Sequence, residues 1–176
     1  MRHGTILAML AAAAAPAAAQ RGAASSAYTP LDLERCTVIE QAEEGASVTW
    51  RCTGRPAIPI IVHGSDERYD IDAGADNGVW ESAGRFNSPG PRIEWRMRGR
   101  RPFAIIYRLS LSGLDEPASS MLGVETIGGR HARGCVVAWI DGRLPNANAL
   151  ARARADARAA SFRCGRDRPE QHGDTQ

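Results

Sequence analysis

The sequence predicts an α+β protein, mainly antiparallel β-sheet, with one C-terminal α-helix packed on the sheet. Short segments with apolar residues at every second position, separated by turns rich in Gly, Pro and Asn, occupy the chain from about residue 36 to residue 140. This pattern is typical of antiparallel strands. A stretch rich in Ala and Arg, residues 148–162, follows them and predicts the helix. The patterns leave open whether the sheet is open, sandwiched or closed into a barrel.

The first hairpin is predicted by the segments CTVIEQ and SVTWRC, which are strand-like and flank an acidic turn. Cys36 and Cys52 each lie eight residues from Glu44. A hairpin centred on Glu44 therefore places the two cysteines opposite each other, at a separation that a disulfide can bridge.

Two further strands are expected over residues 58–63 and 68–73. Pro59 has no N–H to donate to a neighbouring strand, which favours an edge position for the first of these strands. Residues 74–91 contain Asp-Asn-Gly and Asn-Ser-Pro-Gly-Pro in series and predict a long loop. Trp80 and Phe86 lie in this loop and are candidates for binding a ligand or a partner.

The clearest hairpin spans residues 92–112, and its first strand alternates between charged and apolar residues. We expect the charged face to be solvated, with its charges paired. The alternative is a binding surface for a small anionic ligand, because Arg can hold a carboxylate or a phosphate through two hydrogen bonds. The candidate residues for that surface are Arg92, Arg96 and Arg98.

Residues 121–127 and 135–140 are predicted as two more strands before the helix. Within the helix, a stripe of small residues is expected to face the sheet, with the arginines on the solvent side. Cys135 opens the last strand and Cys164 follows the helix, which suggests a second disulfide that ties the helix end to the sheet. The stripe consists of Leu150, Ala153, Ala157 and Ala160.

The first residues predict export. Arg2 precedes an apolar run from Ile6 to Ala15, and three alanines at 17–19 place small residues at a signal-peptide cleavage site. The run is about half as long as a membrane-spanning helix requires. We therefore expect a periplasmic or secreted protein, cleaved near Ala19 and not inserted in a membrane. The expected organisation is a signal peptide (1–19), a flexible lead-in (20–29), a single disulfide-stapled domain (30–164) and a disordered tail (165–176).

Cysteine usage and charge narrow the function classes. An even number of cysteines in an exported chain favours disulfides, and no Cys-x-x-Cys pair supports a thiolate metal site. All 22 basic residues are Arg, so enzymes that need a P-loop lysine or a Schiff-base lysine are excluded. The net charge of +2 predicts no nucleic-acid partner, and no cofactor is expected. The cysteines are Cys36, Cys52, Cys135 and Cys164.

An acidic stretch contains the candidates for a metal site. Asp70, Asp72 and Glu81 fall on positions 1, 3 and 12 of a calcium-binding loop. Gly74 and Ala75, however, stand where that loop needs a ligand and its turn glycine. The pattern favours an ordinary strand that ends in an Asp-Asn-Gly turn, without a metal.

The segments PLDLERC, WRC, DNGVWES, FNSPGPRIEWR, RPFAIIYR and PNANALAR resemble a group of small exported proteins from alphaproteobacteria with no known activity. The resemblance covers about Pro30 to Cys164, implies export and a single domain, and carries no catalytic motif. We expect a non-catalytic periplasmic module that binds an envelope protein or a small anionic ligand. The alternative is an envelope hydrolase or a calcium-binding protein that uses Asp70, Asp72 and Glu81.

Overall fold

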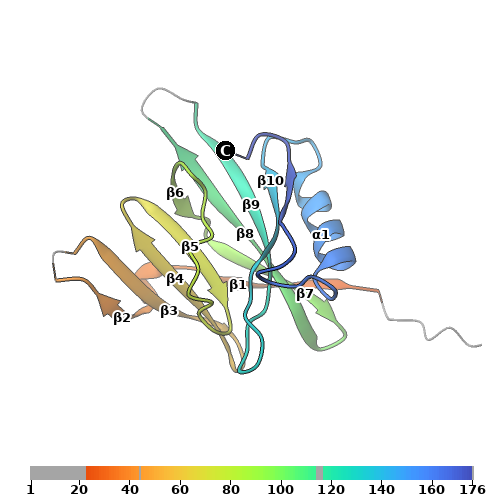
Figure 1. Cartoon of the computed structure of the whole chain (residues 1–176), viewed down its shortest axis with the longest axis horizontal. Helices are drawn as coiled ribbons and strands as arrows, with labels where there is room; N and C mark the ends of the chain where they lie inside the picture. Colours follow the sequence, from red (N-terminus) through yellow and green to blue (C-terminus); the bar gives the residue numbers. More distant parts are fainter. Residues whose placement is uncertain (1–22, 44, 114–116, 176) are drawn as a thin grey trace, which may run out of the picture.

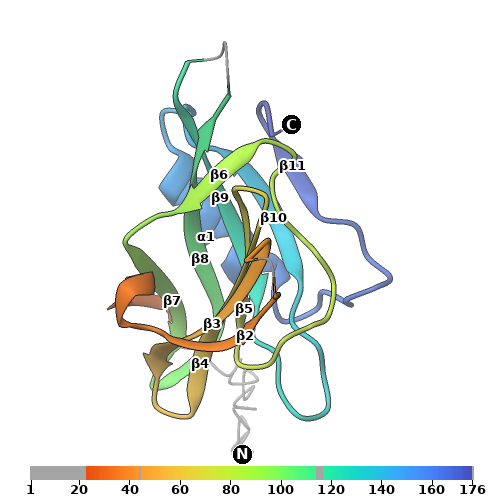
Figure 2. The same cartoon turned by 90° about the vertical axis from the view of Figure 1, so that its left-hand side faces the viewer.

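The protein is built in three layers: a four-stranded sheet, a seven-stranded sheet and one helix (Figures 1 and 2). The computed structural model describes residues 23–43, 45–113 and 117–175, so the predicted signal peptide lies outside the described residues. The predicted fold class is confirmed: the chain is mainly antiparallel β, with helix α1 (Ala147–Arg158) packed on the sheet. The sheets pack face to face, and the structure does not close into a barrel.

The four-stranded sheet is an antiparallel meander in the order β2-β3-β4-β5. The Cys36–Cys52 disulfide joins the first hairpin as predicted, with the Cα atoms 4.4 Å apart. The edge position predicted from Pro59 is wrong, because β4 lies between β3 and β5. The register of β3 and β4 shifts next to Pro59, between Cys52 and Arg55, and such a bulge requires no N–H from proline. The strands are β2 (Thr37–Gln41), β3 (Ser47–Arg55), β4 (Ile58–Ser65) and β5 (Arg68–Ala73).

The seven-stranded sheet has the order β1-β7-β8-β9-β10-β11, and β6 pairs with the far half of β8. The long strand β8 pairs with β7 along its first half and with β6 along its second half, so both hairpin strands predicted over 92–112 are present. The strands are β1 (Ser25–Pro30), β6 (Phe86–Pro89), β7 (Arg92–Arg98), β8 (Arg101–Ser112), β9 (Ser119–Thr126), β10 (Val136–Asp141) and β11 (Glu170–His172).

Both edges of this sheet come from segments predicted to be flexible. Residues 25–29 of the expected lead-in form most of β1, which pairs with β7 from Ser25 opposite Met97 to Pro30 opposite Arg92. In the expected disordered tail, β11 pairs in parallel with β10. Both predictions of disorder are wrong for these residues. Long-range pairing orders them, and their local sequence carries no periodic signal.

The main core lies between the two sheets. Ile60, Val62 and Ile71 from the four-stranded sheet face large side chains of the seven-stranded sheet. Trp95 is fully buried, and its indole N–H donates a hydrogen bond to Thr29 Oγ1 at 2.9 Å. This bond gives the buried indole a partner, as a buried polar group requires.

Helix α1 covers the outer face of the seven-stranded sheet, on the side opposite the four-stranded sheet (Figure 1). Its buried residues are Ala147, Ala151 and Ala155, one per turn, and they pack on residues of β8 to β10 such as Ile106 and Val124. The predicted stripe is therefore wrong for Ala153, Ala157 and Ala160, which are exposed because the helix is rotated away from them, whereas Leu150 packs against the buried cluster. The rotation brings alanines close to the sheet and lets neighbouring charged residues reach β7.

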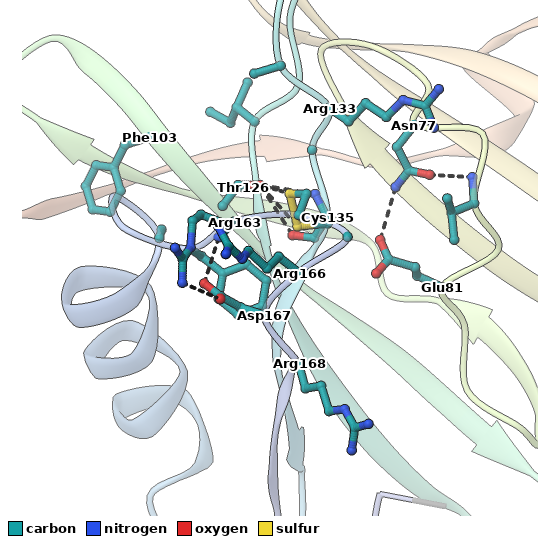
Figure 3. Close-up of a pocket in the computed structure, with 18 residues that line it drawn as sticks. Asn77, Glu81, Phe103, Thr126, Arg133, Cys135, Arg163, Arg166, Asp167 and Arg168 are labelled. Carbon is teal, nitrogen blue, oxygen red and sulfur yellow. Dashed lines mark hydrogen bonds and ion pairs between the residues drawn. A yellow bond between two sulfur atoms is a disulfide. The ribbon is translucent and has the colours of Figure 1, made fainter.

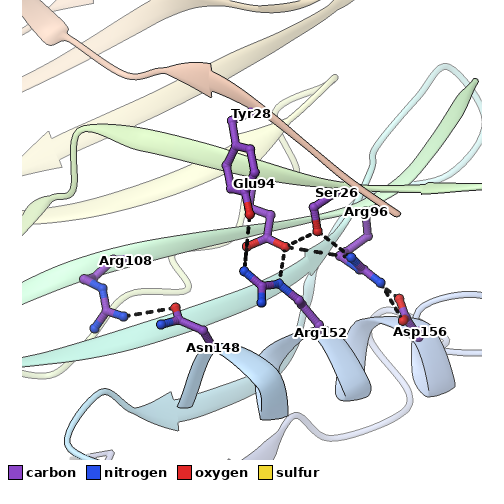
Figure 4. Close-up of polar contacts among 8 residues, drawn as sticks. All are labelled: Ser26, Tyr28, Glu94, Arg96, Arg108, Asn148, Arg152 and Asp156. Carbon is purple, nitrogen blue, oxygen red and sulfur yellow. Dashed lines mark hydrogen bonds and ion pairs between the residues drawn. The ribbon is translucent and has the colours of Figure 1, made fainter. Parts of the chain in front are cut away.

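Paired charges between β7 and α1 fix this rotation (Figure 4). Glu94 accepts two hydrogen bonds from the Arg152 guanidinium, at 2.6 and 3.0 Å. Arg96 donates two hydrogen bonds to Asp156, at 2.9 and 2.6 Å. Two charges of this strand face, those of Glu94 and Arg96, are paired as predicted, but they are not solvated: Glu94 is 7% exposed and Arg96 is 5% exposed. The helix, placed by its alanines, covers them.

The second predicted disulfide is also present. Cys135, directly before β10, bonds to Cys164, which lies beyond the end of α1. The bond therefore ties the segment that leaves the helix to the seven-stranded sheet. No helix in the described part of the chain is long and apolar enough to cross a membrane.

Candidate metal centre

The hairpin of β4 and β5 builds the floor of the candidate site. Its turn places Asp66 and Glu67 at φ values of 49° and 54°, the left-handed conformation that a two-residue type I′ turn needs at both central positions. The turn sets the register in which His63 lies opposite Asp70. Side chains alternate along β5, so Ile71 enters the core while Asp70 and Asp72 point to the other face.

Four polar side chains meet on this outer face. Thr49, His63 and Asp70 form a row across β3, β4 and β5, and Asp72 lies two residues further along β5. The loop after β5 folds back over them and brings Asp76 to His63. Its backbone also contacts the cluster, because the N–H of residue 77 donates to Asp72 Oδ2 at 3.3 Å.

Three ligand atoms of this cluster converge. His63 Nε2 lies 3.4 Å from Asp76 Oδ2 and 3.8 Å from Asp72 Oδ2, and the three atoms are all within 4.8 Å of one another. Two ligands of a tetrahedral zinc ion, each at 2.0–2.2 Å from the metal, are roughly 3.4 Å apart. The two distances from His63 Nε2 are thus close to the spacing that a small divalent cation requires.

The histidine ring is oriented by a neighbour. Thr49 Oγ1 lies 3.1 Å from His63 Nδ1. When Nδ1–H donates to this hydroxyl, the lone pair is on Nε2, the atom that faces Asp72 and Asp76. Metal-binding histidines have such a partner on the second ring nitrogen, and it fixes the tautomer. Within the described residues, His63 Nε2 has no hydrogen-bond partner.

Asp72 is buried, and one of its oxygens is left without a partner. The residue is 1% exposed, and Oδ1 accepts no hydrogen bond from any described residue. Burial, together with the negative charge of Asp70, raises the pKa of Asp72 to about 7. Burial also raises the pKa of Asp70 to about 6, although the Glu81 N–H and His63 counteract the increase. A proton or a cation must neutralise such a cluster, because buried uncompensated charge is costly.

Two glutamates lie at the rear of the cluster. Glu125 of β9 is 1% exposed; its Oε1 accepts a hydrogen bond from the Ala73 N–H at 3.3 Å, while Oε2 has no partner among described residues. Burial and then the charges of Asp72 and Asp70 raise the pKa of Glu125 far above its ordinary value. Burial likewise raises the pKa of Glu81. The carboxyl groups of β5, β9 and the loop are therefore crowded into one region, where each disfavours the ionisation of the others.

A cavity of about 330 Å³ opens beside the cluster. Its wall includes His63, Asp70 and Asp76, together with the indole of Trp80, which is 49% exposed. A cation held by His63, Asp72 and Asp76 would have three protein ligands and would face this cavity. Catalytic zinc sites use three protein ligands and leave the next coordination position open.

The residues predicted as metal candidates are brought together only in part. Asp70 and Asp72 lie in the cluster, but the Glu81 carboxylate is not among the converging ligand atoms. Glu81 Oε2 accepts hydrogen bonds from the Asn77 side-chain amide at 3.1 Å and from the Val136 N–H at 3.2 Å. The ligand spacing of a 12-residue calcium loop is therefore not what assembles this site.

The predicted ligand-binding residues lie in separate places. Of the five, Trp80 lines the cavity beside the cluster. The Arg68 guanidinium lies 5.0 Å from the centre of the Phe86 ring. The three arginines of β7 are occupied in the described structure: Arg92 lies over Tyr28, Arg96 pairs with Asp156, and Arg98 lies over Phe103.

His63, Asp76 and Glu125 were not predicted as members of a site. His63 is near Asp70 only because of the β4–β5 register, and Glu125 is 55 residues away from Asp70 in the chain. One signal was available. Asp70 and Asp72 alternate with Ile71 and Ala73, so their strand carries carboxylates on a complete face, and the facing position on the preceding strand is a histidine.

Comparisons with known proteins add no assignment: no family model matches this chain, and neither the curated proteins nor the solved structures gave a match. The resemblance to small exported proteins therefore stays a prediction.

Proposed function

We propose that this chain is an exported binding protein whose His63–Asp72–Asp76 cluster binds a divalent transition-metal cation. The observation that carries the proposal is the convergence of three ligand atoms within 4.8 Å, one of them on a side chain that is 99% buried and has an unpaired oxygen. The two disulfides are typical of an oxidising compartment and support export. Location in the periplasm or outside the cell is part of the same proposal.

The ligand set favours zinc or manganese over calcium. Calcium takes six to eight oxygen ligands, whereas imidazole nitrogen is a ligand for zinc and other transition ions. His63 supplies that nitrogen, and Thr49 holds its ring. A cation at this position would also remove the electrostatic cost of Asp70 and Asp72, which lie buried on the same strand face.

Thermal unfolding with added metal tests the proposal. A ligand at a hundredfold excess over its Kd stabilises the folded state by about 2.7 kcal/mol, which corresponds to roughly 5–10 °C for a domain of this size. We expect such an increase with Zn²⁺ or Mn²⁺ after treatment with EDTA. His63→Ala and Asp72→Asn should abolish it, and the exposed Glu34→Gln should retain it.

Isothermal titration calorimetry on the same variants distinguishes metal binding at the proposed site from non-specific metal binding elsewhere on the protein. One equivalent of metal per chain is expected for the wild type and for Glu34→Gln. An equal stabilisation of all four proteins, or a response to Ca²⁺ that exceeds the response to Zn²⁺ and Mn²⁺, would contradict the proposal.

A metal-dependent hydrolase is a second candidate, favoured by the position of Asp70. This carboxyl lines the same cavity as His63 and Asp76, and burial raises its pKa to about 6, within the range of a general base. The test is hydrolysis of p-nitrophenyl acetate and p-nitrophenyl phosphate by zinc-loaded protein. Loss of turnover in Asp70→Asn, with metal binding retained, supports this function; equal rates for the variant, or none above the metal-free protein, argue against it.

A further inference from the structure

A second and larger cavity lies where the segment after α1 crosses the seven-stranded sheet (Figure 3). Its volume is about 950 Å³, near the upper end of the range for small-molecule sites. Three segments form its walls: the loop over residues 77–81, the connection between β9 and β10, and residues 162–168. None of the three proposed metal ligands lines it.

The charges around this cavity are mainly positive. Arg133 approaches from the β9–β10 connection, and three more arginines come from residues 162–168 (Figure 3). Among the described residues, an acidic partner is seen only for Arg163, which lies 3.1 Å from Asp167. The guanidinium groups of the other three form no ion pair and no hydrogen bond with any described residue. These three are Arg133, Arg166 and Arg168.

The acidic residues at the cavity do not compensate for these arginines. Asp167 already accepts hydrogen bonds from the backbone N–H and the guanidinium of Arg163. Glu81 is held by Asn77 and by the N–H of Val136, on the wall formed by the loop and β10. The remaining positive charge is therefore available to a ligand.

Part of the lining is apolar, and a disulfide joins two of its walls. Phe103, Ile127 and Phe162 present hydrocarbon surface to the cavity. The Cys135–Cys164 disulfide is part of the lining and joins two of the three walls (Figure 3). A braced wall reduces the conformational entropy that would be lost when a ligand binds.

We propose that this cavity binds a single organic anion: a carboxylate or phosphate attached to an alkyl or aryl body. Arginine forms paired hydrogen bonds with either anionic group, and the apolar wall buries the body. The site is a recess in the protein and takes the molecule as a monomer, rather than as part of a membrane. The proposal does not depend on the metal centre, and its test uses EDTA-treated protein.

The test is titration of ¹⁵N-labelled protein with decanoate below its micelle concentration, followed by backbone amide shifts. Saturable changes are expected at residues 126–135 and 159–168. The double variant Arg166→Gln/Arg168→Gln should bind decanoate at least tenfold more weakly. Its matched control, Arg35→Gln/Arg51→Gln, removes two exposed arginines of the other sheet region and should bind within twofold of the wild type.

Three comparison ligands give the outcomes that decide the proposal. Acetate tests the need for an apolar body, decyltrimethylammonium tests the need for a negative charge, and vesicles of phosphatidylglycerol in phosphatidylcholine test a membrane surface. The proposal is supported if decanoate binds more tightly than both acetate and decyltrimethylammonium, and if the protein does not sediment with the vesicles. Equal binding of the cationic ligand, equal loss in both double variants, or binding to vesicles alone would overturn it.

Discussion

At the scale of single residues, the four-stranded sheet contains carboxylates in positions where a globular protein normally places neutral side chains. Asp70 is 3% exposed, Asp72 is 1% exposed, and Glu125 of the other sheet is 1% exposed. Charged residues are rarely buried to this extent without a partner. In the metal-free protein these groups oppose folding when ionised, so their role should be visible in stability measurements.

The substitution Asp72→Asn is expected to stabilise the metal-free protein at pH 8. The pKa of Asp72 is about 7 in the folded state and 3.8 for a free side chain, so the folded state binds the proton more tightly. The corresponding stability is present below pH 4 and is lost as the pH rises through 7. Asn has no such dependence. Urea unfolding in EDTA should show a gain on the order of 1–3 kcal/mol at pH 8.

The same measurement at pH 4 is the internal control, since the gain should shrink there. Glu34→Gln, which changes an exposed carboxylate outside the cluster, should leave the stability unchanged at both pH values. A loss of stability for Asp72→Asn at pH 8 in EDTA would show that the ionised carboxylate is already compensated within the fold.

At the scale of elements, the docking of α1 on β7 depends on complementary charges under a layer of alanines. Glu94 and Arg96 lie on one strand face, and their partners Arg152 and Asp156 are one helical turn apart. Both Arg–carboxylate contacts are bidentate, a geometry that adds specificity to the charge interaction. The helix thus has one rotation at which both pairs form.

Arg152→Met is expected to destabilise the protein by about 2 kcal/mol, because Glu94 then remains buried without its main partner. Burial raises the pKa of Glu94, but hydrogen bonds from Arg152 and Ser26 outweigh it and bring the net pKa below 4.5. The stabilisation is therefore present above pH 4.5 and is lost as the pH falls below that value. Chemical denaturation between pH 3 and pH 7 measures the effect.

Arg158→Met provides the comparison on the same helix. Arg158 is 42% exposed and lies 3.4 Å from Glu170, so its removal should cost less than about 1 kcal/mol. Similar losses for the two variants would mean that the Glu94 pair adds nothing beyond an ordinary surface contact.

Local periodicity predicted much of the fold but not the position of the helix or the sheet edges. The alternation over 92–98 and the symmetry about Glu44 place strands and a disulfide correctly, because both depend on residues close in sequence. The buried stripe of α1 differs from its prediction because every third or fourth residue is Ala on more than one face. The rotation is fixed by charge partners on β7, Glu94 and Arg96, which lie 58 and 60 residues away in the chain from Arg152 and Asp156.

The metal centre could be predicted only as carboxylates on one strand. Asp70 and Asp72 were visible as candidates, but His63 and Asp76 join the candidate site through the turn at residues 66–67 and the fold of the following loop. The basic cavity gave no sequence signal, because Arg133 and Arg166 lie far apart in the chain and come to line one cavity through the docking of the helix and the Cys135–Cys164 disulfide.

At the scale of the whole molecule, the two disulfides have different neighbours. Cys36–Cys52 closes a hairpin, whereas Cys135–Cys164 holds two walls of the larger cavity. The disulfides close loops of 16 and 29 residues, for which a stabilisation of about 3 kcal/mol from each bond is expected. Their effects on stability should therefore be similar, while their effects on the proposed anion site should differ.

The paired substitutions Cys36→Ser/Cys52→Ser and Cys135→Ser/Cys164→Ser test this difference. Both are expected to lower the free energy of unfolding by a similar amount in urea. Only the second pair should weaken decanoate binding, by at least fivefold, under conditions where both proteins remain folded by circular dichroism. Equal decanoate affinity in the two folded variants would mean that the bond does not shape the cavity.

The pairing of β1 and β11 at the two edges of the seven-stranded sheet has a consequence for biosynthesis. Strand β1 can pair only after β7, about 65 residues further along the chain, has been made. The edge of β10 likewise remains open until residues 170–172 have been made. An incomplete chain therefore presents hydrogen-bonding strand edges, which are templates for aggregation. We therefore expect the β10 edge to stay open to other strands during synthesis until Glu170–His172 pair with it.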